Sequence, residues 1–250
     1  MFFVLKYDIL TAEVIEMKIM TFNTQHCKNF ITGEIDFKIM ADAINKCNPD
    51  IVGLNEMYDE GETENFVNQT KILSELTGLK YHYFAKSIDS YGGKNPYGNG
   101  FLSKIPIVSA KTVMIPDPVR EEGKKHYETR CILKAELENG FTVLVTHIGL
   151  VDTEQKNAVE TILENITSEK CILMGDFNVR PENELLNPIR ECMTDTADMF
   201  EKPLCSWPSD NPIGKIDYIF VSPDIKILSA DIPEIVASDH RPHIAEIECK

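Results

Sequence analysis

Four short polar stretches follow apolar runs in this 250-residue chain, and together their side chains could hydrolyse a phosphate ester. They are residues 54–56 (Leu-Asn-Glu), 146–148 (Thr-His-Ile), 175–178 (Gly-Asp-Phe-Asn) and 238–240 (Ser-Asp-His). Each places a carboxylate, an amide or an imidazole where a buried strand would reach the surface. Such groups bind metal ions, move protons and hold the charge of a phosphate.

The stretch 175–178 is the most specific of the four. The apolar residues 171–174 predict a buried strand that ends at Asp176. Residues i and i+2 of an extended segment point to the same side, so Asp176 and Asn178 could act on one target. The alternative is an Asx turn that only caps the strand. The other stretches, which occur in a matching order, favour the chemical interpretation.

Glu56 ends another apolar run, where a hard cation would find an anionic oxygen. Proteins usually hold Mg²⁺ with one or two carboxylates, while waters and substrate phosphate oxygens complete the coordination. Glu56 with the amide of Asn23 would therefore be sufficient, although a lone glutamate at a strand end is more often simply solvated. We expect Mg²⁺ as the cofactor, with Mn²⁺ as a substitute.

Two of the six histidines, His147 and His240, follow predicted strands or lie beside a carboxylate. Histidine titrates near neutral pH, so it can carry protons or bind phosphate oxygens when charged. Arg130 begins a predicted strand, and a guanidinium suits the two free oxygens of a phosphate; a solvated surface arginine is the alternative. His26 matches no motif, and we interpret it as structural.

Alternating strand-like and helix-like segments would position these side chains. Helices are predicted at 36–47, 62–76 and 153–166, the first two ended by Asn48-Pro49 and Gly78. Strands are predicted at 18–22, 51–54, 81–85, 100–103, 107–115, 129–137, 141–147, 171–174, 216–221, 225–230 and 243–247. The absence of a repeat or a linker favours one α/β domain over residues 17–250, with residues 1–16 as an extension.

Two further segments could select the substrate. Residues 90–100 are predicted to form a flexible loop with two aromatic side chains, which could stack on a ring of the substrate or be an ordinary surface loop. Trp207 could pack beside the site or belong to the core.

The composition limits the partners and the compartment. A formal net charge of −15 disfavours a protein that grips many nucleic-acid phosphates, because such a protein needs a basic face. Seven scattered cysteines without a metal-binding spacing favour a reducing compartment, and we expect the cytoplasm. No apolar run is long enough for a transmembrane segment, and nothing in the sequence implies a protein partner.

Two further residues belong to this pattern: Asn23, which follows Thr-Phe, and Asp217, which precedes the apolar residues 218–220. Together with the four polar stretches, in this order along the chain, they resemble the motifs of the endonuclease/exonuclease/phosphatase superfamily. The resemblance runs from about Lys18 to the C-terminus and is nearest to bacterial stand-alone metal-dependent hydrolases of the sphingomyelinase- and deoxyribonuclease-like type. It implies a four-layer α/β sandwich, in which two mixed β-sheets pack face to face with helices on the outer faces. The sequence shows no clear counterpart of the tyrosine that abasic-site endonucleases use.

The resemblance also implies a role for each residue. Asp176 would deprotonate the attacking water beside Asn178, and His147 would bind the phosphate or protonate the leaving oxygen. His240, paired with Asp217, would contact the phosphate together with Arg130. The implied metal ligands are Asn23, Glu56 and Asp239.

We therefore expect an Mg²⁺-dependent phosphoesterase, most simply a phosphodiesterase. A small phosphodiester or a lipid headgroup is the favoured substrate. An endonuclease or exonuclease acting on DNA or RNA with the same site is the alternative. A non-catalytic module that binds a phosphorylated ligand is a remote alternative. Such a module would usually have lost a reactive residue, and here every expected reactive position is present.

Overall fold

The computed structural model describes residues 14–64, 66–119 and 127–249. The predicted N-terminal extension lies outside the described residues as far as residue 13. Strand β1 (Ile15–Asn23) already begins at Ile15, which pairs with Cys249 of the last strand. Residues 15 and 16 are thus part of the sheet.

Two six-stranded sheets form the centre of the molecule. The first contains, in spatial order, β11 (Lys226–Asp231), β12 (His243–Cys249), β1, β2 (Ile51–Tyr58), β4 (Asn95–Ser103) and β3 (Tyr81–Asp89). The second contains β5 (Ile107–Met114), β6 (Cys131–Leu137), β7 (Thr142–His147), β8 (Cys171–Asp176), β10 (Asp217–Val221) and β9 (Thr194–Asp195). Both sheets are mixed, because β1 and β2, like β7 and β8, run parallel while the other pairs are antiparallel.

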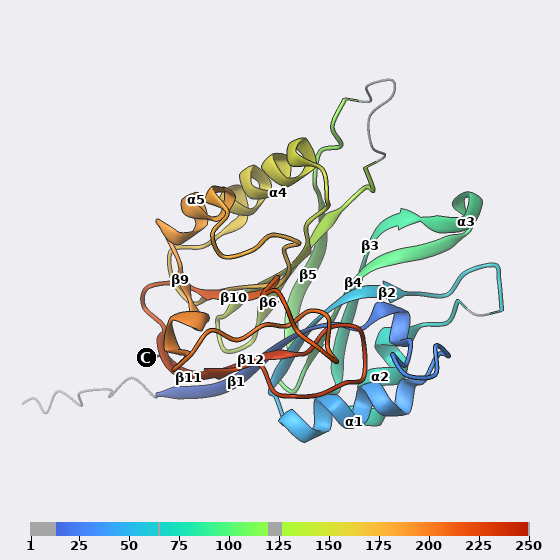
Figure 1. Cartoon of the computed structure of the whole chain (residues 1–250), viewed down its shortest axis with the longest axis horizontal. Coiled ribbons are helices and arrows are strands. Elements are labelled where there is room, and N and C mark those ends of the chain that lie inside the picture. Colours follow the sequence, from blue (N-terminus) through green and yellow to red (C-terminus); the bar gives the residue numbers. More distant parts are fainter. Residues whose placement is uncertain (1–13, 65, 120–126, 250) are drawn as a thin grey trace, which may run out of the picture.

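Helices cover the outer face of each sheet, which completes the four layers (Figure 1). α1 (Phe37–Cys47) and α2 (Gln69–Thr77) lie on the first sheet, and α4 (Asp152–Asn165) and α5 (Asn187–Arg190) lie on the second. The shorter helices are α3 (Ser90–Gly93), η1 (Gln25–Cys27), η2 (Glu184–Leu186) and η3 (Thr196–Met199). The predicted sandwich is confirmed. Among the described residues, every helix is too short or too polar to span a bilayer.

Three apolar clusters hold the layers together. Ile19, Phe101 and Met174 belong to the cluster between the sheets. A second cluster packs α1 and α2 on the first sheet, and a third packs α4 on the second. The central cluster uses the strand side chains that face the other sheet, and the two outer clusters use the alternating side chains that face the helices, as Ile19 and Met20 of β1 show. Both faces of the strands are thus apolar, and the polar strand ends are left at the rims of the sandwich.

The structure corrects the prediction for the second helix. α2 begins at Gln69, because the side chain of Asn68 accepts a hydrogen bond from the backbone N–H of Lys71 and caps the helix there. Phe66 lies before the helix and packs on Tyr58 at a ring distance of 4.2 Å. Leu76, the last residue of the predicted helix, is exposed.

Residues 90–100 also differ from the prediction, because most of this segment is ordered rather than a flexible loop. β4 begins at Asn95 and pairs with β3 and β2. The strand lies so close to β3 that a Cβ atom on Gly98 would be 2.0 Å from the carbonyl oxygen of Ala85. Glycine at this position therefore lets β4 pair with β3, although a glycine-rich sequence is more typical of a loop.

Gly175 provides a test of how tightly the strand end before Asp176 is built. Its φ is 147°, and a Cβ atom would lie 1.8 Å from the carbonyl oxygen of Thr146 on β7. We expect Gly175→Ala to lower the free energy of unfolding by about 3 kcal/mol or more in urea denaturation, since strain and overpacking add. Gly214→Ala is the control, because its Cβ would meet only ordinary contacts at 3.7 Å. Equal losses of stability in the two variants would contradict this account.

Candidate active site

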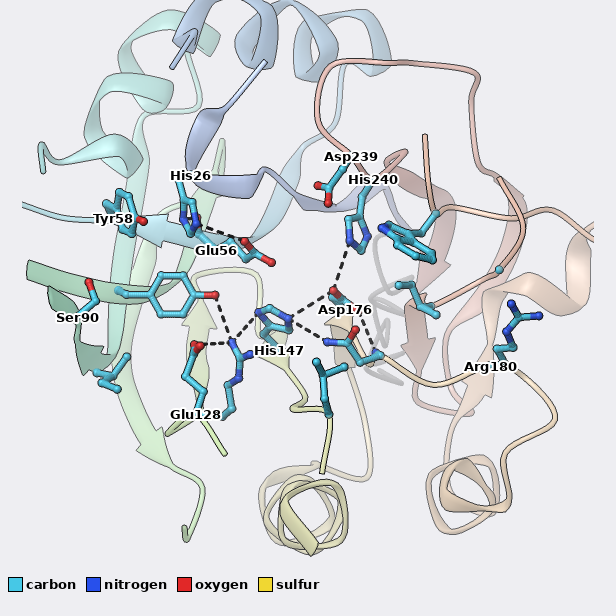
Figure 2. Close-up of a pocket in the computed structure, with 18 residues that line it drawn as sticks. His26, Glu56, Tyr58, Ser90, Glu128, His147, Asp176, Arg180, Asp239 and His240 are labelled. Atoms are coloured by element: carbon cyan, nitrogen blue, oxygen red, sulfur yellow. Dashed lines mark hydrogen bonds and ion pairs between the residues drawn. The ribbon is translucent and has the colours of Figure 1, made fainter. Parts of the chain in front are cut away.

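A pocket of about 800 Å³ opens at the rim where both sheets present their strand ends (Figure 2). Most of the predicted site residues line it: Glu56, Arg130, His147, Asp176, Asn178, Asp239 and His240. Asn23 and Asp217 are fully buried and contact the lining residues from behind. The structure thus brings all the predicted residues together, from both sheets.

Asp176 lies at the centre of this arrangement. Its Oδ2 accepts a hydrogen bond from Asn23 Nδ2 at 3.0 Å and lies 3.4 Å from His147 Nε2 and 3.7 Å from His240 Nε2. Burial raises the pKa of Asp176 to about 7; His240 opposes this rise, and the charge of Asp217 adds to it. A carboxylate with a pKa near the working pH is suited to take up and release a proton.

The turn after Asp176 combines the two interpretations that the sequence left open. Oδ1 of Asp176 accepts a hydrogen bond from the backbone N–H of Asn178 at 2.9 Å, which is an Asx turn. Oδ2 of the same carboxylate faces the pocket. The extended geometry expected for this segment is wrong, because Asn178 has a left-handed φ of 54°. Its amide still lines the pocket and donates to the carbonyl oxygen of Ile148 at 2.9 Å.

Glu56 also has a left-handed backbone, with a φ of 58°. The register of β2 against β4 shifts between Leu54 and Met57, so the strand bulges at this residue. Bulges of this kind redirect a side chain at the edge of a site. The carboxylate of Glu56 consequently lies in the pocket rather than in the sheet, and Asn23 Nδ2 donates to its Oε1 at 3.1 Å.

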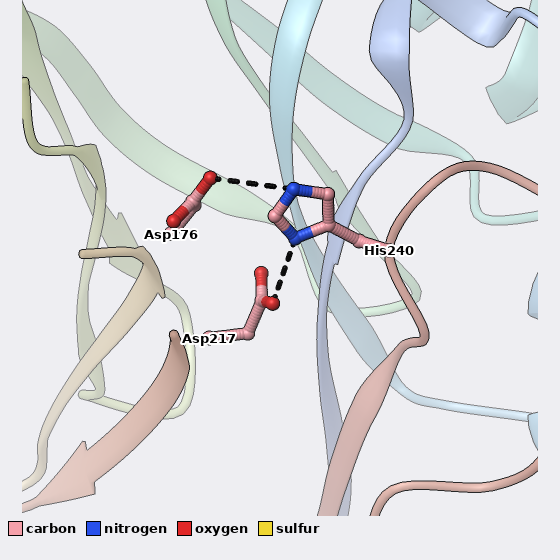
Figure 3. A group of neighbouring side chains, drawn as sticks. All are labelled: Asp176, Asp217 and His240. Carbon is pink, nitrogen blue, oxygen red and sulfur yellow. Dashed lines mark hydrogen bonds and ion pairs between the residues drawn. The ribbon is translucent and has the colours of Figure 1, made fainter. Parts of the chain in front are cut away.

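His240 and Asp217 form a buried charged pair (Figure 3). His240 Nδ1 donates to Asp217 Oδ2 at 2.8 Å. Burial lowers the pKa of His240, but the carboxylates of Asp217 and Asp176 outweigh this and raise it to about 10. His240 is therefore an imidazolium at neutral pH, and its Nε2 proton faces Asp176.

Two groups of side chains are candidates for a cation site. The ligand atoms of Asp176, Asp217 and His240 lie within 4.8 Å of one another. An imidazolium has no lone pair for a metal, however, and Nδ1 of His240 is already bonded to Asp217. We therefore interpret this group as a protonated histidine between two carboxylates rather than as a metal site.

The second group, Asn23, Glu56 and Asp239, fits a hard divalent cation. Burial raises the pKa of Asp239; His240 opposes this, and the charge of Glu56 adds to it, so the two carboxylates repel across the pocket. Burial lowers the pKa of the neighbouring His26, and the charge of Glu56 opposes this.

Paired carboxylates such as Glu56 and Asp239 are typical ligands of Mg²⁺ or Mn²⁺. Asn23 directs its Nδ2 to Glu56, and its Oδ1 accepts a hydrogen bond from the backbone N–H of Gln25 at 3.1 Å, so its carboxamide would turn to offer an oxygen to the cation.

Arg130 is buried, with 9% of its surface exposed, so the alternative of a solvated arginine is wrong. It lies just before β6, and its Nη1 lies 3.1 Å from Glu128, 3.3 Å from the Tyr97 hydroxyl and 3.0 Å from His147 Nδ1. Trp207 is 39% exposed and lines the pocket, which excludes the core position that the sequence left open.

The sequence did not single out three residues that build the site. Asn55 is fully buried and joins the sheets, since its Nδ2 donates to the carbonyl oxygen of Thr146 and its Oδ1 accepts from the backbone N–H of Asp176. His26 stacks on Tyr58 and contacts the Glu56 carbonyl through Nδ1. Tyr97 contacts Arg130. For Asn55 the sequence did offer a signal, because a polar side chain inside an apolar strand and next to Glu56 indicates a buried hydrogen-bonding role.

Comparisons with known proteins agree with this architecture. A model of the endonuclease/exonuclease/phosphatase family matches residues 20–240. No curated protein sequence matches the chain.

Several solved structures share the fold. An endonuclease/exonuclease/phosphatase from Beutenbergia cavernae DSM 12333 has a TM-score of 0.79 and 21% identity, over 94% of this chain and 72% of that chain. A mannosyl-6-phosphatase from Bacteroides thetaiotaomicron VPI-5482 has a TM-score of 0.72 and 15% identity, over 92% and 99%. A humanized D. rerio TDP2 has a TM-score of 0.67 and 15% identity, over 93% and 98%.

The buried pair predicts how His240 titrates. Asp217→Asn removes the charge that outweighs burial, so the pKa of His240 should fall from about 10 to below neutrality. NMR titration of the histidine ring in EDTA measures this directly. Asp224→Asn is the control, because that carboxylate binds Ser222 instead. A His240 that stays charged at pH 8 in Asp217→Asn would show that Asp217 does not hold the charge.

Proposed function

The chain belongs to the endonuclease/exonuclease/phosphatase family and is a hydrolase, and we propose that it cleaves a phosphodiester with the help of Mg²⁺. The observation that carries this proposal is the position of Asp176. Its buried carboxylate lies between the imidazolium of His240 and the carboxamide of Asn23, which also contacts Glu56. A proton acceptor thus stands beside a positive charge and beside a site suited to a cation.

In this proposal the residues divide the work as follows. Asn23, Glu56 and Asp239 hold the cation, which when bound neutralises phosphate charge and polarises the P–O bonds. Asp176 takes a proton from the attacking water at Oδ2. His240, Arg130 and Asn178 bind the phosphate oxygens and stabilise their developing charge.

The charge distribution supports a small substrate rather than a polymer. The net charge is −15, and Glu56, Glu128 and Asp239 share the pocket with Arg130 and Arg180. A protein that binds many nucleic-acid phosphates needs a basic face. One structural neighbour is named a mannosyl-6-phosphatase, so a small phosphate ester suits this fold. We propose a small phosphodiester or a lipid headgroup as the substrate.

We further propose that the predicted domain over residues 17–250, extended to Ile15 by the start of β1, is one catalytic domain. All seven cysteines are free, which agrees with a reducing compartment, and we propose the cytoplasm as its location.

Hydrolysis of bis-p-nitrophenyl phosphate tests the proposed function. The wild type should turn over the diester with Mg²⁺ and lose this activity in EDTA. Asp176→Asn should reduce kcat by about 10²–10⁴-fold, the contribution of one general base. Asp152→Asn, which changes an exposed carboxylate on α4, should keep wild-type activity.

A folded Asp176→Asn variant with nearly full activity would overturn the assignment. The same assay at rising salt separates the two substrate classes. A small diester should lose little activity between low and moderate salt, whereas a steep fall in the cleavage of DNA or RNA would favour the nuclease.

A further inference from the structure

The contact between Arg130 and His147 determines where the proton of His147 lies. Arg130 Nη1 is 3.0 Å from His147 Nδ1. A guanidinium is permanently charged and has only donors, so Nδ1 must be the acceptor. An imidazolium carries a proton on both ring nitrogens and offers no acceptor. While this contact exists, His147 is neutral and its single proton lies on Nε2.

Arg130 is held too firmly for this contact to be incidental. Its Nη1 also lies 3.3 Å from the Tyr97 hydroxyl and 3.1 Å from Glu128 Oε1. Its Nε lies 3.8 Å from the buried carboxylate of Glu154, which comes from the first turn of α4. Its guanidinium carbon is 5.9 Å from the centre of the Tyr97 ring. Contacts from β4 and α4 thus fix the guanidinium against the histidine.

The other groups around His147 also disfavour a charged ring. Burial lowers the pKa of His147 well below its usual range, and the charges of Arg130, His240 and His26 lower it further. The facing carboxylate is Asp176, 3.4 Å from Nε2, and it already accepts hydrogen bonds from Asn23 and from the backbone of Asn178.

The amide nitrogen of Asn178, which can only donate, lies 3.1 Å from Nε2 and donates to the carbonyl oxygen of Ile148 at 2.9 Å. Both ring nitrogens of His147 therefore face a donor, and only one of them can accept.

A proton on Nδ1 would face the guanidinium charge of Arg130, whereas a proton on Nε2 faces a neutral amide and can turn to Asp176 Oδ2 at 3.4 Å, so the second tautomer is favoured. His240 has the opposite surroundings, because a carboxylate, that of Asp217, faces its Nδ1 where a guanidinium faces the Nδ1 of His147.

We propose that Arg130 fixes His147 as a neutral imidazole with its proton on Nε2, so that His147 donates a hydrogen bond to the phosphate and does not protonate the leaving oxygen. Arg130 is then a positioning residue for His147 in addition to a phosphate ligand. This assigns His147 the first of the two roles that the sequence analysis left open, and excludes the second.

The consequence for the substrate rests on the proposed phosphoesterase function. The oxygen of water bonds to phosphorus, and its proton passes to Asp176. The bond between phosphorus and the leaving oxygen breaks, and its electron pair stays on that oxygen, which takes a proton from solvent water after it departs. Among small phosphodiesters, those whose leaving oxygen is more stable as an anion, such as aryl esters, should therefore be hydrolysed faster than alkyl esters.

NMR spectroscopy of the ¹⁵N-labelled protein in EDTA tests the tautomer without any turnover. The His147 signals are identified by their loss in His147→Gln. We expect a protonated Nε2 and an unprotonated Nδ1 from pH 8 down to pH 6. A ring with both nitrogens protonated at pH 6, or with its proton on Nδ1, would overturn the proposal.

A matched pair of variants tests the part played by Arg130. Arg130→Met should raise the pKa of His147 by at least about one unit and release the tautomer. Arg180→Met removes another guanidinium from the pocket lining and should leave the tautomer fixed. The same response in both variants would overturn the role of Arg130. The wild-type spectrum remains decisive for the tautomer if Arg130→Met does not fold.

A series of methyl aryl phosphates with phenols of graded acidity tests the consequence for the substrate. The dependence of kcat/KM on phenol acidity should be steep in the wild type and equally steep in His147→Gln. A flat dependence in the wild type that becomes steep in His147→Gln would show that His147 protonates the leaving oxygen. If the wild type hydrolyses none of these esters, the phosphoesterase proposal fails, while the NMR result still decides the tautomer.

Discussion

The rest of the site depends on how one protonated histidine compensates the charge of two carboxylates that are buried side by side. β8 and β10 pair so that Asp176 lies opposite Asp217, and both side chains are almost completely buried. Neighbouring buried carboxylates repel each other unless a positive charge or a proton lies between them. His240 supplies that charge from the segment before β12. Its imidazolium binds Asp217 tightly and leaves Asp176 with a pKa near 7.

The two sheets contribute different chemistry to this rim. The first sheet contributes the proposed cation ligands Asn23, at the end of β1, and Glu56, in the bulge of β2, and the second contributes His147 and Asp176. Asn55 hydrogen-bonds across the gap, so the two halves keep their spacing. Arg130 and Asp217 then give the two histidines opposite protonation states. A charged donor and a neutral donor consequently stand on either side of the same carboxylate.

Much of this could be predicted because each reactive side chain lies at or near a strand end, and apolar runs mark the strands. The prediction failed where the determining contact is distant in sequence. The segment 90–100 looks like a loop, yet buried amides stabilise it as a strand, since Asn99 bonds the carbonyl of Cys131 and the side chain of Asn55. The contact of Arg130 with His147 depends on the packing of β6, β4 and α4, which no local pattern records. The left-handed backbone of Asn178 follows from an Asx turn that the sequence offered only as an alternative.

The most direct test of this division of labour is to locate the cation by anomalous diffraction from crystals soaked in Mn²⁺. The account predicts a peak with oxygen atoms of Asn23, Glu56 and Asp239 within about 2.0–2.5 Å, and His240 still bonded to Asp217. A peak between Asp176, Asp217 and His240, with that bond broken, would contradict it.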